Sequence, residues 1–533
     1  MAPILVLVSF FTLIFLLSNF QKLKKSKSRR RPLPPGPKGW PILGYLPFLG
    51  PKPHQTFHAL SNTYGPLLHL RLGTVDVIVP CSADMASKLL RNDMNFIQRP
   101  PNSAAKHIAY NYMGLGFSPY GPRWRMLRKL CTLQLFSTKA LDGLQHARRG
   151  EVSRFVRRLA EANDRKNGSA ATVDVSSEIA ACVVNSLSQL LVGRRVFDDG
   201  EEVKEFKEMI MDLMYLTGAF HVGDFVPGIG WLDPQGLVKR MKRLHRNFDD
   251  FLNKVIEDYR GTTRSDNEKK ASVDDGKGNE EGTNRRRNLL SVLLDLKENA
   301  DGKDGSLKDI DIKTLFQDVF AAGSDTTTIT AEWTLAELIR HPDMLARAQA
   351  ELDDVVGRNR LVEESDLPNL PYLQAVLKET FRLHPPGPLS VPRMAVADCE
   401  VGGYLIPKGS NLLLNVWAIG RDPEVWPDEP LEFRPDRFLP GGRHEGVEVR
   451  GNHFGLVPFG AGRRMCAGIN LGLRMVHLVT ATMMHSFDWS LPNGLQPCDL
   501  DMEEKFNGLT LHRIEPLLAC PLPRLAPHVY QNL

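Results

Sequence analysis

The chain has 533 residues, 42% of them hydrophobic, and its 67 lysines and arginines nearly balance 62 aspartates and glutamates. This composition supports a large globular core and excludes an intrinsically disordered chain. The 7 cysteines include no C-x-x-C pair, which argues against a zinc site or a disulfide framework.

The N-terminus is predicted to be a membrane anchor over residues 2–20. This stretch carries no charge, and about 20 helical residues span the hydrocarbon core of a bilayer. The basic residues follow the apolar stretch rather than preceding it, which argues against a cleaved signal peptide. They are Lys22, Lys24, Lys25, Lys27, Arg29, Arg30 and Arg31. Because such a flank stays in the cytosol, we expect one membrane pass and a catalytic domain that faces the cytosol.

A basic and proline-rich hinge is predicted over residues 21–37. Its end, Pro32-Leu33-Pro34-Pro35-Gly36-Pro37, cannot be helical because proline fixes φ and lacks an N–H donor. No second linker follows, so residues 38–533 are predicted to form one catalytic domain. The positive charge is concentrated beside the apolar run rather than spread over a face of this domain, which indicates membrane lipid as a partner and no nucleic acid.

The predicted fold class is mainly α with a minor β-sheet region. Helical spacing of apolar residues recurs over 123–135, 145–163, 203–216, 236–259, 308–340, 343–356, 372–384 and 468–486. Alternating residues predict two hairpins, one over 67–79 around Gly73-Thr74 and one over 401–416 around residues 407–409. Residues 261–287 are predicted to be a solvated loop. Residues 218–236 are apolar but interrupted by Gly and Pro, which fits either a buried loop or a loop that dips into the bilayer.

The stretch from Phe459 to Gly468 carries the clearest chemistry. Gly462 and Gly468 allow tight turns near Cys466, and a helix predicted to follow would add positive potential. Arg463 and Arg464 are expected to bias the sulfur of Cys466 toward thiolate. A thiolate placed in this way is suited to binding a metal, and thiolate ligation of haem iron favours cleavage of an O–O bond.

The pattern F-x-x-G-x-R-x-C-x-G in this stretch resembles the haem-binding loop of the cytochrome P450 superfamily, and the resemblance extends from Pro34 to the end of the chain. It implies the P450 fold with haem b as cofactor and Cys466 as the metal ligand. It also implies that Phe459 shields the sulfur and that Arg464 binds a haem propionate.

Two further basic positions are expected at the propionates. Trp124 and Arg128 are four residues apart, so an indole N–H and a guanidinium on one helix face can reach the same carboxylate. The family's W-x-x-x-R motif supports this assignment, and Arg393 resembles the family's basic position on a later strand.

Lys378-Glu379-Thr380-Phe381-Arg382 matches the E-x-x-R motif of the family. The resemblance implies that Arg437, from the second motif at residues 433–438, joins Glu379 and Arg382 in a buried structural triad. In that motif the residue before the arginine is commonly Glu, whereas this chain has Asp436.

The helix predicted over 308–340 contains the run from Ala321 to Thr328, in which Gly, Ser, Asp and Thr are poor helix formers. Hydroxyl groups that bond back to helix carbonyls loosen the helix, which would open a groove for O₂. The sequence matches the family's A-G-x-D-T oxygen motif. By resemblance, Asp325 connects to the proton supply, Thr326 assists O–O cleavage, and Ala322 and Gly323 line the distal haem face.

The chain has no G-x-G-x-x-G or G-x-x-x-x-G-K-[ST] motif for a nucleotide. The family therefore implies electrons from NADPH through a separate NADPH–cytochrome P450 reductase, and a place in the endoplasmic reticulum membrane. Stretches at 99–103, 105–112 and 120–125 resemble the plant flavonoid B-ring hydroxylases. Their substrates are flavanones, flavones, flavonols or dihydroflavonols.

Thr510 in the segment 506–511 indicates the position of hydroxylation. This turn projects into the substrate pocket in the family, where Thr goes with the 3′ position and a smaller residue with both 3′ and 5′. We therefore expect a 3′-hydroxylase. A 3′,5′-hydroxylase and a related phenolic or flavone hydroxylase remain open, as do a haem-thiolate isomerase without a reductase and a non-catalytic scaffold.

Overall fold

The computed structural model describes residues 31–91, 94–164, 171–197, 200–271, 288–298 and 307–533. The predicted anchor, residues 2–20, and most of the predicted hinge lie outside these residues. Within the described part of the chain, one helix, Val175–Val192, is long and apolar enough to cross a membrane. Because 78% of that span is buried inside the protein, it is a helix of the core.

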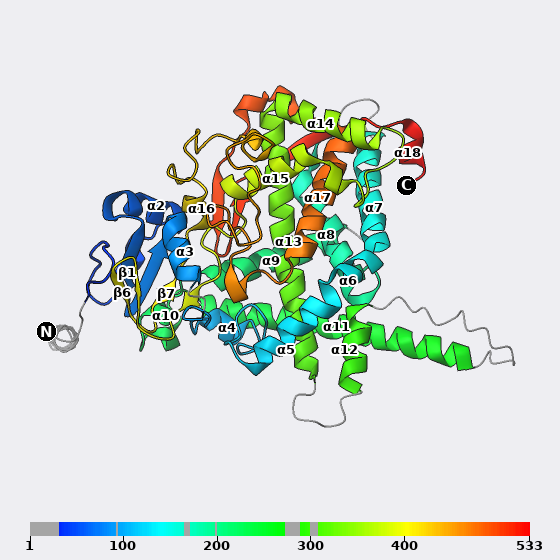
Figure 1. Cartoon of the computed structure of the whole chain (residues 1–533). Coiled ribbons are helices and arrows are strands. Elements are labelled where there is room, and N and C mark those ends of the chain that lie inside the picture. Colours follow the sequence, from blue (N-terminus) through cyan, green and yellow to red (C-terminus); the bar gives the residue numbers. More distant parts are fainter. Residues whose placement is uncertain (1–30, 92–93, 165–170, 198–199, 272–287, 299–306) are drawn as a thin grey trace.

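Helices make up most of the described chain and the sheets are small, which confirms the predicted fold class (Figure 1). The helices are α2 (Pro53–Tyr64), α3 (Ala83–Arg91), α4 (Ser103–His107), α5 (Pro122–Leu130), α6 (Thr138–Gly143), α7 (Gln145–Asp164), α8 (Val175–Val192), α9 (Gly200–Gly218), α10 (Val222–Phe225), α11 (Leu237–Ala271), α12 (Leu289–Glu298), α13 (Asp309–Arg340), α14 (Pro342–Val356), α15 (Pro371–Leu383), α16 (Val416–Ile419), α17 (Ile469–Ser486) and α18 (Pro527–Gln531).

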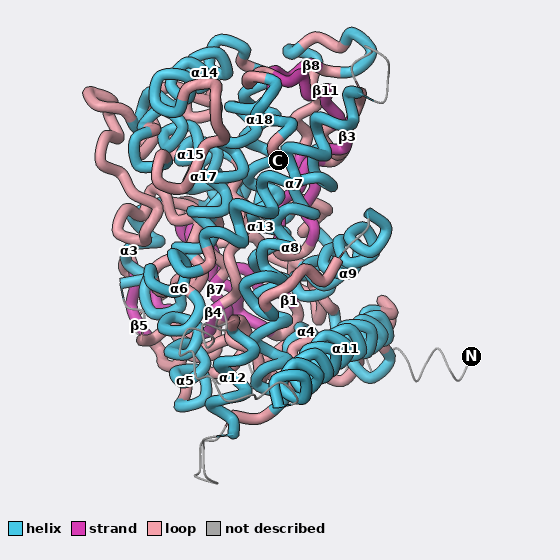
Figure 2. Tube along the Cα trace, turned by 90° about the vertical axis from the view of Figure 1, so that its right-hand side faces the viewer, coloured by secondary structure: helices cyan, strands magenta, loops and turns pink. Residues whose placement is uncertain are grey.

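Helix α13 is the centre of the core. It packs against α8, α15 and α17, and it crosses the middle of the molecule in Figures 1 and 2. Apolar residues lie on all of its sides, so it can be stable only when it is surrounded by protein. Its large side chains, Phe316, Phe320 and Trp333, are completely buried.

The strands of the described residues form four small sheets. They are β1 (Leu67–Leu72), β2 (Val75–Pro80), β3 (Val173–Asp174), β4 (Arg393–Met394), β5 (Cys399–Val401), β6 (Tyr404–Ile406), β7 (Asn411–Leu412), β8 (Phe487–Ser490), β9 (Glu504–Asn507), β10 (Thr510–Arg513) and β11 (Leu518–Pro523). The largest sheet has the order β1-β2-β7-β4, and β9 and β10 form a hairpin of their own.

The hairpin predicted over 67–79 is confirmed, whereas the hairpin predicted over 401–416 has its turn at a different position. β1 and β2 pair antiparallel on either side of Gly73-Thr74, with Leu72 opposite Val75. In the second region β5 pairs with β6 across Gly402 and Gly403, while β7 pairs with β2 instead. The φ angles of these two glycines are +60° and +83°, which a two-residue turn of this kind requires.

Three other expectations differ from the structure. α11 continues to residue 271, into the segment predicted to be a loop, because many of those charged residues are good helix formers. The helix predicted over 123–135 changes to a π-helical turn over Cys131–Leu135. α8 was not predicted as a helix; its valines, serines and asparagine are weak helix formers, and packing of this largely buried helix outweighs their low propensity.

The segment 218–236 is buried in its first half and exposed in its second. Phe220 and Phe225 pack against a hydrophobic cluster of the core, and Val226 is buried. Further along, Trp231 is 81% exposed and Leu232 is 54% exposed. One half of the loop is therefore part of the core, while the other half presents large apolar side chains at the surface.

Candidate active site

A closed loop presents Cys466 directly before α17. Gly460 and Gly462 both have φ of +70°, a left-handed conformation that favours glycine, so the chain turns sharply at both. The backbone N–H of Cys466 donates to the carbonyl of Phe459 at 3.0 Å. The ring of Phe459 lies edge-on to Phe381, with 5.3 Å between the centroids, which connects the loop to α15.

Cys466 keeps accessible surface in the folded chain, although protein atoms surround its sulfur on nearly every side. Burial raises the pKa of the Cys466 thiol, and the N–H of Gly468 and the charge of Arg128 oppose that rise in part. Arg128 is therefore a cation that favours the thiolate, and a bound metal cation would deprotonate a coordinating thiol.

The middle of α13 offers a matching face. Ala322 is exposed, and Gly323 and Thr326 are half-buried, whereas most of the helix is buried. Ala322 and Thr326 are four residues apart and so share one face. α13 packs along α17, the helix that follows Cys466. An exposed alanine in a buried helix and an accessible cysteine beside the neighbouring helix form the pattern expected where a flat group binds between them.

Three arginines gather beside this region and bond to the protein backbone. Arg128, Arg393 and Arg464 donate to backbone carbonyls at 2.7–2.8 Å. Arg464 also lies over the ring of Trp124, 4.6 Å from its centroid. Burial, together with the charges of Arg393 and Arg128, lowers the pKa of Arg464 to about 10. The Nη1 atom of Arg464 is buried and makes no hydrogen bond to any described residue, so the cluster fits a bound dianion such as a haem.

Arg99 belongs to the same cluster, although no motif in the sequence predicts a role for it. It donates to the backbone carbonyls of residues 116, 391 and 392 at 2.7–2.9 Å, which joins the loop before α5 to the segment before β4. Burial and the charges of Arg464 and Arg393 lower the pKa of Arg99 well below its usual range. Its position in the distinctive stretch 99–103 was the one available signal.

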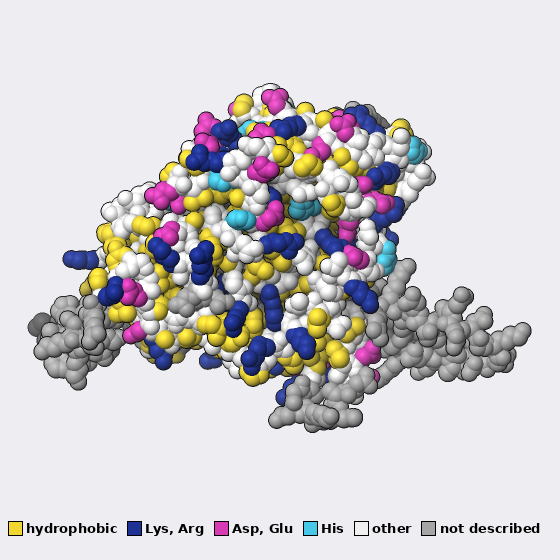
Figure 3. Space-filling model, in the orientation of Figure 1, with side chains coloured by type: hydrophobic (Ala, Val, Ile, Leu, Met, Phe, Trp, Pro, Cys, Tyr) yellow, Lys and Arg dark blue, Asp and Glu magenta, His cyan; other side chains and the backbone are white. Residues whose placement is uncertain are grey.

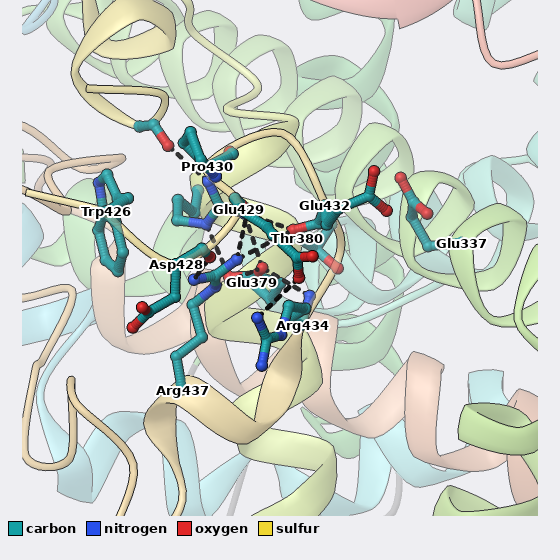
Figure 4. A network of polar contacts seen from close by, with 12 residues as sticks. Glu337, Glu379, Thr380, Trp426, Asp428, Glu429, Pro430, Glu432, Arg434 and Arg437 are labelled. Carbon is teal, nitrogen blue, oxygen red and sulfur yellow. Dashed lines mark hydrogen bonds and ion pairs between the residues drawn. The ribbon is translucent and has the colours of Figure 1, made fainter. Parts of the chain in front are cut away.

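The triad residues Glu379, Arg382 and Arg437 lie together in the core, and Figure 4 shows Glu379 and Arg437 in this network. Arg382 contacts both carboxylate oxygens of Glu379 at 2.7 Å, and Nε of Arg437 lies 3.0 Å from Oε1. The side chains of Glu379 and Arg382 are completely buried, so this pair is not surface decoration. Asp436 instead points outward and pairs with Arg347 at the surface.

The hydroxyl groups of the oxygen motif bond back along α13. Thr326 donates to the carbonyl of Ala322 at 2.7 Å, and Ser324 donates to that of Phe320 at 2.6 Å. The helix nevertheless remains continuous from residue 309 to residue 340. Asp325 is buried and points toward β10, where Nε2 of His512 lies 3.3 Å from its Oδ2. His512 gave no signal in the sequence, because only the tertiary structure brings β10 to α13.

Thr510 opens β10 and is almost completely buried. Its hydroxyl lies 3.1 Å from Nε2 of His512, two residues further along the same strand face. The preceding turn residues, Gly508 and Leu509, line a cavity of about 230 Å³ together with Phe506. The other walls of this cavity come from β2, α4, the end of α9, α10 and the segment 389–394.

Comparison with known proteins agrees with this geometry. Residues 34–518 match the family model described as cytochrome P450. The chain is 56% identical over 504 residues to a flavonoid 3′-monooxygenase from Crocosmia x crocosmiiflora, with 94% of each chain covered. It is 50% identical to a flavonoid 3′-monooxygenase from Petunia hybrida, over 98% of this chain and 97% of the relative. It is also 49% identical to a flavonoid 3′,5′-hydroxylase from Crocosmia x crocosmiiflora, over 98% and 96% of the two chains.

Proposed function

Because this chain belongs to the cytochrome P450 family, we propose that it is a haem-thiolate monooxygenase that hydroxylates the B-ring of flavonoids at the 3′ position. The observation that carries this proposal is the 56% identity, over nearly the full length, with a flavonoid 3′-monooxygenase. The reaction inserts one atom of O₂ into a ring C–H bond. The other atom becomes water, with two electrons from NADPH and two protons.

The residues around Cys466 are suited to holding the haem. Cys466 would be the iron ligand and Phe459 would shield its sulfur, while Ala322 and Gly323 would lie on the opposite face. Trp124, Arg128, Arg393 and Arg464 would bind the two propionates, which supplies the anion that the arginine cluster requires. The bound haem would supply oxygen activation, because thiolate donation favours O–O cleavage.

Proton delivery is assigned to Asp325 and Thr326. The Thr326 hydroxyl donates to the Ala322 carbonyl. Its oxygen can still accept a hydrogen bond from a proton donor or from a water. Asp325 is buried one residue before Thr326 and lines a small cavity together with His512. We assign the carboxylate to proton supply and the hydroxyl to proton positioning, while Glu379, Arg382 and Arg437 keep a structural role.

The cavity of about 230 Å³ between α4, α10 and the β9–β10 turn is proposed as part of the route for the flavonoid. Apolar residues such as Phe220, Phe225 and Leu509 dominate its wall, and Asn102 and Asp224 provide polar contacts. An apolar wall with a few polar groups is typical of a site for a planar phenolic compound. Leu509 directly precedes Thr510 in the chain, which connects this wall to the threonine.

Electrons are proposed to come from NADPH–cytochrome P450 reductase, docked on the side of α5. Arg125 and Lys129 are exposed on this helix, whose Arg128 contacts the carbonyl of Met465 beside the cysteine. In Figure 3 basic and hydrophobic side chains predominate along the lower half of the molecule, where α5 lies in Figure 1. Charge reversal at Arg125 and Lys129 should weaken reduction, more so at low ionic strength.

The protein is proposed to reside in the endoplasmic reticulum membrane, with residues 2–20 as anchor, residues 21–37 as hinge and residues 38–533 in the cytosol. The described part adds an apolar corner, formed by Trp40, Phe48, Trp231 and Leu232, which are 42–81% exposed. Both segments of this corner bond to the β1–β2 turn, through Leu43 to Gly73 and Phe225 to Thr74. Protease protection in microsomes tests this orientation.

A second candidate, hydroxylation at both the 3′ and 5′ positions, is favoured by the 49% identity to a 3′,5′-hydroxylase. One assay tests both candidates: microsomes that contain the protein and the reductase are supplied with a panel of flavanones, flavones and dihydroflavonols. The proposal requires products that depend on NADPH and the reductase. Product formation without the reductase would favour an isomerase, and a protein without a thiolate-type carbon-monoxide spectrum would favour a scaffold.

A further inference from the structure

His512 lies between Thr510, at the start of β10, and Asp325, the acid assigned to proton supply. Its Nε2 atom lies 3.3 Å from Oδ2 of Asp325 and 3.1 Å from Oγ1 of Thr510. The side chains of His512 and Asp325 are 15% and 7% exposed. One imidazole nitrogen on β10 therefore has two competing partners, a carboxylate on α13 and a hydroxyl on its own strand.

A small cavity lies against the same groups. It has a volume of about 30 Å³, with a polar end formed by Asp325, His512, Ser324 and Thr328, and with Ser176 and Lys207 on another side. The rest of its wall is apolar and comes from residues of α8 and α9 such as Val184, Phe206 and Ile210. Within the described part of the chain, Oδ2 of Asp325 and Oγ1 of Thr328 are buried and make no hydrogen bond. A polar cavity of at least about 10–15 Å³ can hold a water, and unsatisfied polar atoms favour its binding.

The cavity continues toward solvent through Lys207. This side chain is half-buried, and its ammonium donates to the hydroxyls of Ser176 and Ser177 at 3.1 and 3.2 Å. Ser177 in turn donates to Asp174 at 2.6 Å, at the start of α8. A chain of polar groups thus runs from the edge of α8 and α9 to Asp325.

The charges around His512 favour its protonated form. Burial lowers the pKa of the imidazole, but the negative charge of Asp325 at 3.3 Å, with a further contribution from Glu332, outweighs burial and raises the pKa above its usual value. The positive charge of Lys207 opposes this rise without reversing it. An imidazolium beside a carboxylate is suited to passing a proton to it.

We propose that His512 is the proton relay that recharges Asp325, taking its proton from water in the cavity beside Lys207. This inference rests on the proposed function. In each transfer the Nε2–H of the imidazolium moves to the Asp325 carboxylate, and Nε2 regains a proton from cavity water that exchanges with solvent. No electrons move, and the net change is one solvent proton delivered to Asp325. His512 acts through Asp325, so it is a positioning residue rather than a catalytic one.

Thr510 regulates this relay. When Nε2 is protonated it donates to Asp325, with the Thr510 oxygen as a second acceptor. When Nε2 is unprotonated, the Thr510 hydroxyl can donate to it instead. Thr510 follows Leu509, which lines the proposed substrate cavity. Its hydroxyl also lies beside Nε2 of His512, the nitrogen that carries the proton.

The first test measures the histidine itself. NMR of the holoenzyme with ¹³C-labelled histidine should give one imidazole that titrates above the usual value of 6.5, that disappears in His512→Gln and that shifts to lower pH in Asp325→Asn. His528→Gln, the same change at an exposed histidine on α18, should leave that resonance in place. A His512 imidazole that is already neutral at pH 6 would overturn the proposal.

The second test measures coupling of NADPH to product in the reconstituted enzyme. His512→Gln should keep the thiolate-type carbon-monoxide spectrum and the rate of reduction. The product formed per NADPH should fall about tenfold, with more hydrogen peroxide and a larger solvent isotope effect. Unchanged coupling and isotope effect would refute the relay. A wild type without flavonoid product would refute the proposed function instead, while the NMR titration would still report on the Asp325–His512 pair.

Discussion

The backbone N–H of Cys466 donates to the carbonyl of Phe459 at 3.0 Å, so the cysteine closes its own loop. The loop is connected to α15 by the contact of the Phe459 and Phe381 rings, and Arg128 holds its other end at the Met465 carbonyl. These contacts fix the position of the sulfur directly before α17.

Replacement of the sulfur should remove the spectroscopic signature of the site. Cys466→Ser is expected to abolish the thiolate-type band of the reduced carbon-monoxide complex, because an alcohol lacks the strong donation of a thiolate. Cys498→Ser, a change at an exposed cysteine, is the matched control and should retain the band. A Cys466→Ser protein with an unchanged band would show that another residue is the ligand.

Removal of the Thr326 hydroxyl should lower the amount of hydroxylated product formed per NADPH consumed. Thr326→Ala is expected to bind haem but to release hydrogen peroxide, with product per NADPH lowered about tenfold, since proton positioning is lost. Thr482→Ala removes a hydroxyl with the same back-bond on α17 and should leave coupling unchanged. Stoichiometry of NADPH, peroxide and product is the measurement; equal coupling in both variants would contradict the role of Thr326.

The triad should contribute to stability rather than to the reaction. Glu379→Gln leaves Arg382 and Arg437 buried without a charge partner, and we expect a loss of about 3–5 kcal/mol in the free energy of unfolding. Asp84→Asn breaks an exposed pair with Lys88 and should cost less than about 1 kcal/mol. Urea unfolding compares the two, and a cost for Glu379→Gln as small as that of the control would contradict a buried, paired carboxylate.

Asp318 should make stability depend on pH. Its buried carboxylate accepts N–H bonds from Leu115 and Gly116, but burial outweighs them and raises its pKa from 3.8 to about 7. The folded state therefore holds this proton more tightly than the unfolded state. Its contribution to stability is complete below pH 3.8, falls as pH rises to about 7 and changes little above that.

Asp318→Asn tests this dependence, because the amide keeps an acceptor oxygen but does not titrate. The stability of the variant relative to wild type should rise between pH 4 and 7, as measured by urea unfolding at each pH. The exposed Asp436→Asn is the control. A constant difference between Asp318→Asn and wild type across this range would contradict the assignment.

Thr510 should influence where the ring is hydroxylated. Thr510→Ala is expected to raise the fraction of trihydroxylated product, since one methyl group in a pocket is worth about 1–3 kcal/mol of selectivity. Thr510→Val keeps the branched shape and removes the hydroxyl that faces His512. If volume sets the position, the valine variant should keep wild-type selectivity; a valine variant that behaves like the alanine variant would instead assign the effect to the hydroxyl.

The spacing of apolar residues was sufficient to predict segments whose structure depends mainly on their own sequence. The β1–β2 hairpin, α13 and α17 follow from spacing and from Gly73-Thr74, and the motif around Cys466 led to the family. Pattern failed at α8, where valine, serine and asparagine lower the helix propensity and burial in the core stabilises the helix. It also failed at His512 and Arg99, because their partners on α13 and near β4 are distant in the sequence and only packing brings them together.

Chromatography of the products that the wild-type protein forms with the reductase, NADPH and a 4′-hydroxylated flavanone distinguishes 3′-hydroxylation from every alternative. We expect mainly the 3′,4′-dihydroxy product, formed only when both NADPH and O₂ are present. A product that is largely 3′,4′,5′-trihydroxylated would contradict the assignment to the 3′ position, and the absence of any hydroxylated flavonoid would contradict the proposed activity itself.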